Sequence, residues 1–324
     1  MLAALVAVAL LALLTGPYPL GVADIAGALA RRLAGGAAVP AVDTVLFGVR
    51  LPRIGAAILV GAALAAAGAA YQSLFRNPLV SPDILGVSAG AGLGAVLGIF
   101  LALPVAGIQV LAFAGGLATV ALVYLVAAAV RGREPVLVLV LAGVVVGALA
   151  GAMISLLKVL ADPYDQLPAI TFWLLGSLAG TTPADLAGAL PAVLLGLAPL
   201  ILLRWRIDVL ALGDEEARAL GVEAGRLRRI VVAAATLVTA AVVAISGQIG
   251  WIGLVVPHMA RILVGPGFAR LLPAAMLLGA AYLLLVDTVA RSLSTVETPL
   301  GILTALLGAP FFLWLLARGR TGWA

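Results

Sequence analysis

The sequence predicts an all-α polytopic membrane protein with about ten transmembrane helices, two inverted repeats and short broken helices. Of the 324 residues, 64% are hydrophobic and only 10% are charged, whereas soluble domains carry about 25% charged residues. The mean hydropathy is +1.25. A helical span needs about 20 apolar residues, and runs approaching this length recur along the chain. We therefore predict one membrane domain over residues 1–324 and no soluble domain.

Apolar runs separated by polar or Gly/Pro-rich turns place the predicted spans, some of which are short. The first run could instead be a signal peptide, but it lacks a basic leader and a clear cleavage site, so we expect a first helix. Residues 18–53 lie between spans, and a short interfacial helix is expected there. The predicted spans are residues 1–17, 54–74, 84–102, 107–130, 135–158, 184–203, 229–248, 252–264, 271–290 and 299–317.

Two Gly/Pro-containing segments interrupt the apolar pattern. Residues 76–94 read RNPLVSPDILGVSAGAGLG, and residues 246–263 read SGQIGWIGLVVPHMARIL. Irregular backbone at membrane depth survives only where it is buried in protein or lines a cavity. The segments take matching places in two units, residues 54–158 and 229–317, which enter the membrane from opposite sides. Inverted units with broken helices at matching positions indicate a transport pathway at their interface.

Arginine placement predicts the orientation, because cytoplasmic loops carry an excess of basic residues. Most arginines fall on one side when the N-terminus is inside, so we expect both termini in the cytoplasm. The charged segment 204–229 lies on that side, and its length favours a docking surface over a solvated connector. Within it we expect a helix over 215–220, with Asp214 as N-cap and Gly221 just past its end, and a second helix from about 223.

Residue content excludes several classes of function. The chain has no cysteine, which excludes disulfides and iron–sulfur clusters. Its one histidine, His258, has no neighbouring metal ligands in the sequence and is assigned a structural role. The single lysine, Lys158, is not part of a GxxxxGK[ST] motif, so no P-loop is present. The arginines are scattered, and no nucleic-acid binding is expected. We predict no catalytic residue, metal or cofactor in this chain.

Several long segments, in one order, resemble the BtuC-like (FecCD-type) permease subunits of ABC importers for ferric siderophores, haem or cobalamin. The resemblance implies a ten-span homodimer in the cell (inner) membrane, with two cytoplasmic ATPase subunits that hold ATP and Mg and one periplasmic or extracellular substrate-binding protein. The segments are RLPR at 50–53, GAALAAAGAAYQSLFRNPLVSPDILGVSAGA at 61–91, FWLLGSLAG at 172–180, LALGDEEARALGV at 210–222, GWIGLVVPHMARILVG at 250–265, LLPAAMLLGAAYLLLVDTVAR at 271–291 and PLGILTALLGAPFFLWLL at 299–316.

The resemblance also implies roles for individual residues. Asn77, Pro78 and Leu79 would belong to a cytoplasmic gate, although a proline-made turn with Asn77 capping a helix end is compatible with the same residues. Arg50, Arg53 and Arg291 would meet acidic groups on the binding protein, and the alternative is that they snorkel to the interface. The residues that would couple to the ATPase are Gly213, Asp214, Glu215, Glu216, Ala217, Leu220 and Gly221.

Gly143, Gly147 and Gly151 recur every fourth residue in the fifth span. Such a stripe lets helices pack closely; in the family this span lines the pathway, and packing is the favoured interpretation here. Asp287 is costly in lipid unless it is paired, and Arg291, one turn further on, is the expected partner. Asp83 is expected near the N-terminus of the third span, where the helix dipole favours an acidic group, and is assigned a structural role.

The substrate is the least determined feature. The wording of SPDILGV, of AFAGG at 112–116 and of YDQLPAITFW favours ferric siderophores, while haem, cobalamin and oxyanions such as molybdate stay open. An ion-coupled secondary carrier is the alternative function, because such carriers also use inverted repeats and broken helices. Carriers normally keep titratable groups in mid-membrane, whereas here the charges lie near span ends.

Overall fold

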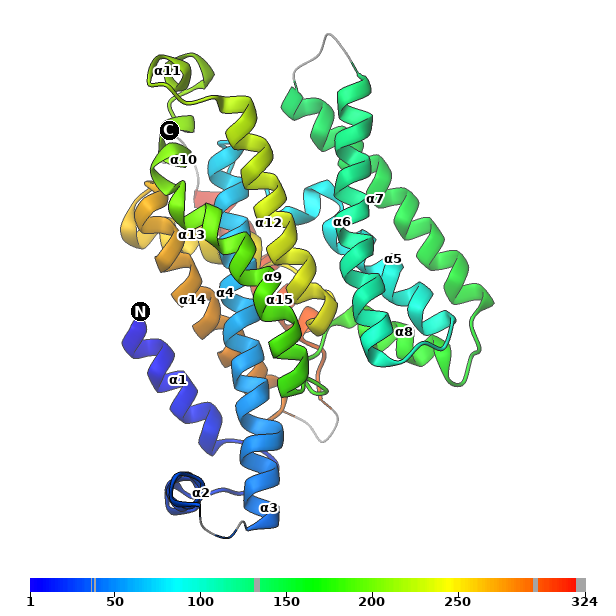
Figure 1. Cartoon of the computed structure of the whole chain (residues 1–324), viewed down its shortest axis with the longest axis vertical. Helices are drawn as coiled ribbons and strands as arrows, with labels where there is room; N and C mark the ends of the chain where they lie inside the picture. The colour runs from blue at the N-terminus through cyan, green and yellow to red at the C-terminus, as the bar shows by residue number, and fades with distance from the viewer. Residues whose placement is uncertain (36, 38, 131–134, 294–296, 319–324) are drawn as a thin grey trace.

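The structure, a computed structural model, is an all-helical bundle (Figure 1). It describes residues 1–35, 37, 39–130, 135–293 and 297–318. One end of the bundle carries α11 and is called the α11 end; the opposite end carries α2 and is called the α2 end (Figure 1). The helices of the first half are α1 (Leu2–Leu14), α2 (Val22–Ala34), α3 (Pro40–Asp43), η1 (Thr44–Arg50), α4 (Leu51–Leu74), η2 (Pro82–Leu85), α5 (Val87–Phe100), α6 (Val105–Ala129) and α7 (Pro135–Leu160).

The second half begins with a short helix at the α2 end, α8. Two further short helices, α10 and α11, separate its long helices at the α11 end (Figure 1). The elements are α8 (Gln166–Leu175), α9 (Pro183–Leu202), α10 (Arg204–Leu210), α11 (Asp214–Ala219), α12 (Ala224–Ser246), α13 (Ile252–Val264), α14 (Phe268–Ala290) and α15 (Leu300–Arg318).

Each predicted span corresponds to a helix, but the helices fall into two lengths. Six are long and apolar enough to cross a membrane in the described part of the chain, and α1, α5, α8, α13 and α15 are shorter apolar helices. The span predicted at 54–74 is the inner part of a continuous helical stretch, Pro40–Leu74, that passes through the π-helical turns of η1. The prediction of short interrupted spans is therefore confirmed for α5 and α13.

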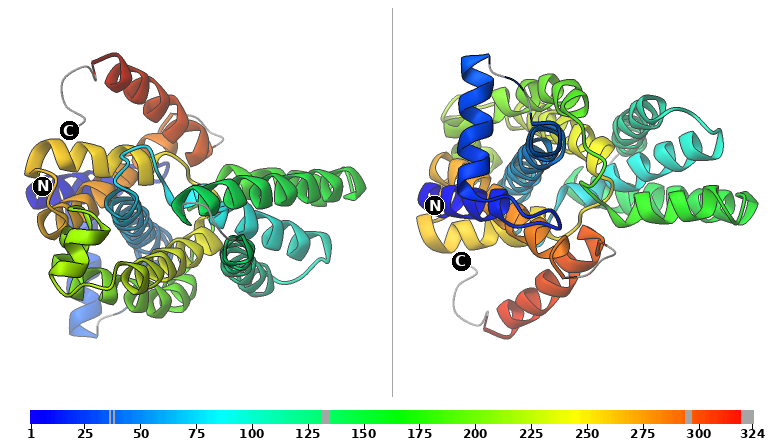
Figure 2. Two further views of the ribbon diagram at one scale, coloured as in Figure 1. Left: turned by 90° about the horizontal axis from the view of Figure 1, so that it is seen from above. Right: turned by 90° about the horizontal axis from the view of Figure 1, so that it is seen from below.

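The central helix is α4, the most buried of the long helices, which runs through the middle of the bundle when viewed end-on (Figure 2). Its small residues allow the close approach of other backbones. A Cβ added at Gly61 would overlap the carbonyl group of Gly279 in α14, and one added at Gly68 would overlap that of Gly253 in α13. Alanine and glycine in this helix therefore set the spacing of the core.

Helix pairing is reciprocal between the two predicted units. The first helix of each unit packs against the third helix of the other, as α4 on α14 and α12 on α6. It also contacts the other unit's short helix, as α4 on α13 and α12 on α5. Within each unit, the short helix packs on the third and fourth helices. This is the pattern that two related units would produce, and the boundaries of the repeats stay a prediction.

The segment between α1 and α4 forms its own small apolar cluster at the α2 end, with Leu20, Ala28 and Leu46 buried in it. The predicted interfacial helix is α2, and its Arg31 lies 3.9 Å from Asp43 of α3. The hydropathy pattern did not predict α8, because ten residues are too few for a span.

Candidate transport and coupling site

The two broken segments meet inside the bundle. The Gln248 side chain, in the turn before α13, donates a hydrogen bond of 2.7 Å to the carbonyl oxygen of Ser88 in α5. From α4, Gln72 donates to the carbonyl oxygen of Leu254 at 3.0 Å and accepts from Arg261 at 3.1 Å. Side-chain amides thus join α4 to α13 and the turn before α13 to α5, by hydrogen bonds to backbone carbonyls of the two short helices.

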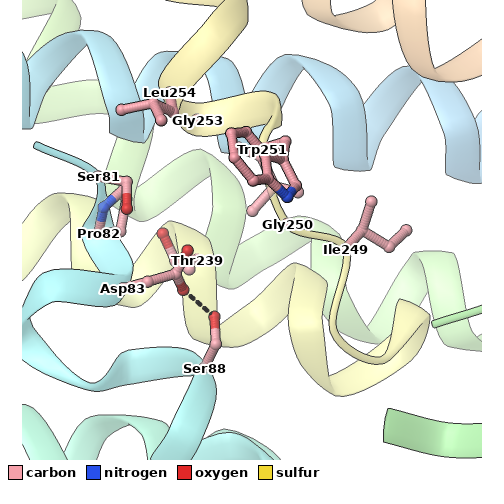
Figure 3. A pocket seen from close by; sticks show the side chains of 11 residues that line it. Ser81, Pro82, Asp83, Ser88, Thr239, Ile249, Gly250, Trp251, Gly253 and Leu254 are labelled. Atoms are coloured by element: carbon pink, nitrogen blue, oxygen red, sulfur yellow. Dashed lines mark hydrogen bonds between the residues drawn. The ribbon is translucent and has the colours of Figure 1, made fainter. Parts of the chain in front are cut away.

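A pocket of about 260 Å³ with a mixed polar and apolar lining lies where these segments come together (Figure 3). The Ser88 hydroxyl donates a hydrogen bond to the carboxylate of Asp83, so Asp83 links η2 to the first turn of α5. Thr239 of α12 and Trp251 also line the pocket. Trp251 has a φ of +70°, a left-handed conformation that few non-glycine residues adopt, and this backbone turn presents its indole ring to the pocket (Figure 3).

The loop that contains the predicted gate residues is a defined turn. At the end of α4, the N–H of Asn77 bonds to the carbonyl of Gln72 and the N–H of Arg76 to that of Ser73, which is a Schellman motif with Arg76 in the left-handed conformation. The Asn77 side chain then accepts from the N–H of Leu79 at 2.9 Å. The predicted proline turn with a capping Asn77 is therefore present, and the gate role of Asn77, Pro78 and Leu79 stays a prediction.

The predicted ATPase-coupling residues lie in and around α11. The N-cap is Gly213, with a φ of +129°, so the assignment of Asp214 as N-cap was wrong by one residue. Gly221 has a φ of +77° directly after the C-cap, as predicted. Ala217 is buried, while Asp214, Glu215, Glu216 and Leu220 are exposed. The segment thus presents an acidic surface on a short helix with a buried anchor.

Three residues relate this segment to the neighbouring parts of the fold. Asp208 of α10 accepts hydrogen bonds from the N–H groups of Phe268 and Ala269 and so caps α14 from a distant part of the chain. Asp214 pairs with Arg228 of α12 at 3.1 Å. The guanidinium group of Arg76 lies near Gly213, 3.9 Å from where a Cβ would stand. The predicted coupling segment is therefore bonded to α12 and α14 and lies near the loop after α4.

The three arginines predicted to lie on the outer side, Arg50, Arg53 and Arg291, are buried and have internal partners. Arg53 donates to Asp287 at 2.9 Å and to Glu297 at 2.6 Å. Arg50 donates to the carbonyls of Leu13 and Tyr18. Since Asp287 pairs with Arg53 of another helix, the expected pairing with Arg291 was wrong.

Arg291 instead donates to the carbonyl of Ala12 in α1. The guanidinium group of Arg291 thus satisfies one of the last carbonyl groups of α1, which have no partner within the helix. A role of the three arginines in docking a binding protein stays a prediction.

The three glycines of the α7 stripe differ in how closely neighbouring backbone approaches them. A Cβ at Gly143 would overlap the carbonyl of Ile84 in η2, whereas Gly147 only approaches Gly86 and Gly151 has open space. Gly143 therefore has the predicted packing role, and a pathway role for Gly151 stays a prediction. His258 keeps a buried Nδ1 without a partner, and no cluster of potential metal ligands occurs in the described ranges.

Sequence reasoning missed several residues of this site. Gln72 and Gln248 were the detectable ones, because an isolated amide in an apolar helix or beside a break needs a hydrogen-bonding partner. Arg76 and Asp208 gave no comparable signal, since exposed charged residues at helix ends are common.

Comparison with known proteins agrees with this architecture. The FecCD transport family model matches residues 4–318. The molybdate import system permease MolB of Haemophilus influenzae is 42% identical over 98% of this chain and 94% of its own length. The cobalamin import system permease BtuC of Halobacterium salinarum is 43% identical over 86% of this chain and 75% of its own.

A solved structure gives the same result for the fold. It is described as an inward-facing conformation of a provisionally assigned metal-chelate type ABC transporter. It superimposes with a TM-score of 0.87 at 41% identity, over 98% of this chain and 97% of its own. Permease subunits of this family are not enzymes and carry no cofactor. The chain therefore belongs to the FecCD transport family, as a multi-pass permease subunit of an ABC importer.

Proposed function

We propose that this chain imports a metal chelate, and within that class a ferric siderophore, across the cell (inner) membrane. Two copies would form the membrane dimer, with two ATPase subunits at the α11 end and one binding protein at the α2 end. In this arrangement both termini are cytoplasmic. Residues 319–324 lie outside the described residues.

The observation that carries the proposal is the attachment of the coupling segment. Through Asp208 and Asp214, this segment is bonded to two long helices, and it lies near Arg76 in the loop that leads into a broken segment. A displacement of α11 by a partner would therefore reach the pocket between η2 and α13 without passing through a flexible linker. Coupling carried by packed elements with two arrangements is the physical basis of such switching.

The segments SPDILGV, AFAGG and YDQLPAITFW support a ferric siderophore as the substrate. The relatives support a wider class of substrates that includes cobalamin and molybdate. An ion-coupled carrier finds no support, because family membership assigns the energy source to a separate ATPase. Contact between Arg53 and a binding protein would require Arg53 to leave Asp287. The internal partners of the arginines therefore support a structural role at the α2 end.

Uptake in proteoliposomes tests the proposal. The complex of this chain with its co-purifying ATPase would be given the cognate binding protein loaded in turn with a ferric siderophore, haem, cobalamin or molybdate. We expect ATP-dependent uptake of the ferric siderophore. Uptake of another ligand alone would replace the proposed substrate, and uptake driven by an ion gradient without ATP would contradict the proposed mechanism. A variant ATPase that binds but does not hydrolyse ATP is the control.

A further inference from the structure

A second cavity, separate from the broken segments, opens at the α11 end. It has a volume of about 330 Å³ and lies between the α9–α10 junction and the turn that precedes α12. Its apolar lining residues are Leu203, Val222, Leu227 and Ile230, its charged ones are Arg206, Glu223 and Arg226, and Gly221, one of the predicted coupling residues, completes it. The lining thus holds two basic groups and one acidic group among apolar side chains.

The two arginines of this cavity have no partner of their own. Arg206 and Arg226 are exposed, and neither forms a salt bridge within the part of the chain that the structure describes. Arg228, by contrast, is already paired with Asp214. A guanidinium group presents a planar fork of donors that matches phosphate oxygens. The electrostatics of the cavity therefore suit a phosphate-bearing anion.

The surroundings of the cavity identify where that anion comes from. α9 and α12 are both apolar enough to span the membrane, and the cavity lies where α9 ends and α12 begins. Next in sequence to the lining residues Leu203 and Arg206, Leu202 is 80% and Trp205 is 62% exposed. Tryptophan is enriched at the level of lipid headgroups, and an exposed leucine at a span end suits acyl chains. A phosphate carried by a lipid satisfies both the arginines and this apolar rim.

We propose that this cavity binds the headgroup of an anionic phospholipid of the surrounding leaflet, with Arg206 and Arg226 on its phosphate and its acyl chains beside Leu202 and Trp205. Basic pockets between membrane helices bind such headgroups in general. The proposal rests on the membrane location of the chain and not on the transported substrate. It would tie the α9–α10 junction, and so the base of the coupling segment, to the lipid composition.

Lipid retention by the purified full chain tests this. Native mass spectrometry would count bound phosphatidylglycerol against phosphatidylethanolamine with the same acyl chains. Arg206→Gln with Arg226→Gln is expected to lower the affinity for phosphatidylglycerol roughly tenfold. The matched control, Arg204→Gln with Arg229→Gln, removes equal charge from exposed arginines outside the cavity lining and should change it less than about twofold.

A variant that should bind the lipid more strongly distinguishes loss of the site from loss of the fold. Glu223→Gln removes the acid from the lining, and because Glu223 makes no side-chain capping bond to α12, the fold should be kept. We expect stronger retention of phosphatidylglycerol. The proposal would be overturned if both double variants lost the same amount of phosphatidylglycerol affinity, or if neither lost any. It would also be overturned if the unmodified chain retained phosphatidylglycerol and phosphatidylethanolamine equally. A cavity double variant that keeps the lipid but loses the ATPase would overturn it as well, since the cavity would then be a protein interface.

Discussion

Arg53 donates hydrogen bonds to two carboxylates at once, Asp287 of α14 and Glu297 of the segment before α15. Asp287 is fully buried, and a carboxylate in that position is costly without a partner. Arg53, by contrast, would keep Glu297 as a partner without Asp287. The pair joins α4 to α14 at the α2 end, and the buried Asp287 depends on it.

Removing Arg53 alone should destabilise the protein more than removing Arg53 and Asp287 together. We expect Arg53→Met alone to destabilise the protein by roughly 3–5 kcal/mol, because it leaves the buried Asp287 unpaired. Asp287→Leu alone should cost less, since Arg53 keeps its hydrogen bonds to Glu297. The double variant should lose less than Arg53→Met, because the buried carboxylate is gone as well. Thermal unfolding in detergent measures the cycle. Additive losses would contradict the interpretation, and Asp24→Asn, an exposed acid of α2, is the control.

Gly68 tests the close contact between α4 and α13. A Cβ there would overlap the carbonyl of Gly253, so we expect Gly68→Ala to destabilise the protein by about 1–3 kcal/mol through overpacking. Gly188 of α9 is also helical but has open space. Gly188→Ala should be neutral, or stabilising by up to about 1 kcal/mol. The difference between the two melting temperatures is the measurement, and equal effects would show that the contact is not tight.

The short helix α11 carries a prediction at the scale of an element. Glu215 and Leu220 are exposed on it, while its packing relies on Ala217. Glu215→Arg with Leu220→Asp should therefore leave the permease folded but reduce ATPase binding at least about tenfold, since charges reversed at an interface cost several kcal/mol. Co-purification measures this. Asp165→Arg, an exposed acid at the α2 end, is the control, and full retention of the ATPase would contradict docking by α11.

Hydropathy was sufficient to predict the long helices, because a span needs a long apolar run and little else does. It also located α5 and α13 as broken elements, since glycine and proline interrupt an otherwise apolar pattern there. It could not predict α8 or α10, which are too short to leave a hydropathy signal. It also placed the start of the second span too late, because residues 40–50 mix polar and apolar side chains within one continuous helix.

The partner of Asp287 shows why the site was harder to predict than the fold. On a single helix, the neighbour one turn away is the only partner that spacing can identify, and for Asp287 that is Arg291. The actual partner, Arg53, is 234 residues away in sequence. Only the packing of α4 on α14 brings the two together, and that packing depends on glycines such as Gly61 and Gly279. Side-chain pairing across helices follows from the fold and not from local sequence.

At the scale of the molecule, the reciprocal pairing places the broken segment of each unit against the first helix of the other. Gln72 and Gln248 then connect the two breaks through hydrogen bonds to backbone carbonyls. The predicted coupling segment lies at one end of this arrangement and the Arg53 cluster at the other. Since α11 packs on α12, which in turn packs on α4 and α6, we expect a displacement of α11 to act on both units, whereas the α2 end is held by buried charges.

The orientation of the chain is the last prediction, and the absence of cysteine makes it directly measurable. Single cysteines at Glu215 in α11 and at Tyr164, which is 87% exposed before α8, would mark opposite ends of the bundle. With the excess of arginine inside, an impermeant maleimide should label Tyr164→Cys in intact cells and Glu215→Cys only after permeabilisation. Leu33→Cys, 90% exposed in α2, is a second outer marker. Labelling of Glu215→Cys in intact cells would invert the topology and place α11 where no ATPase could reach it.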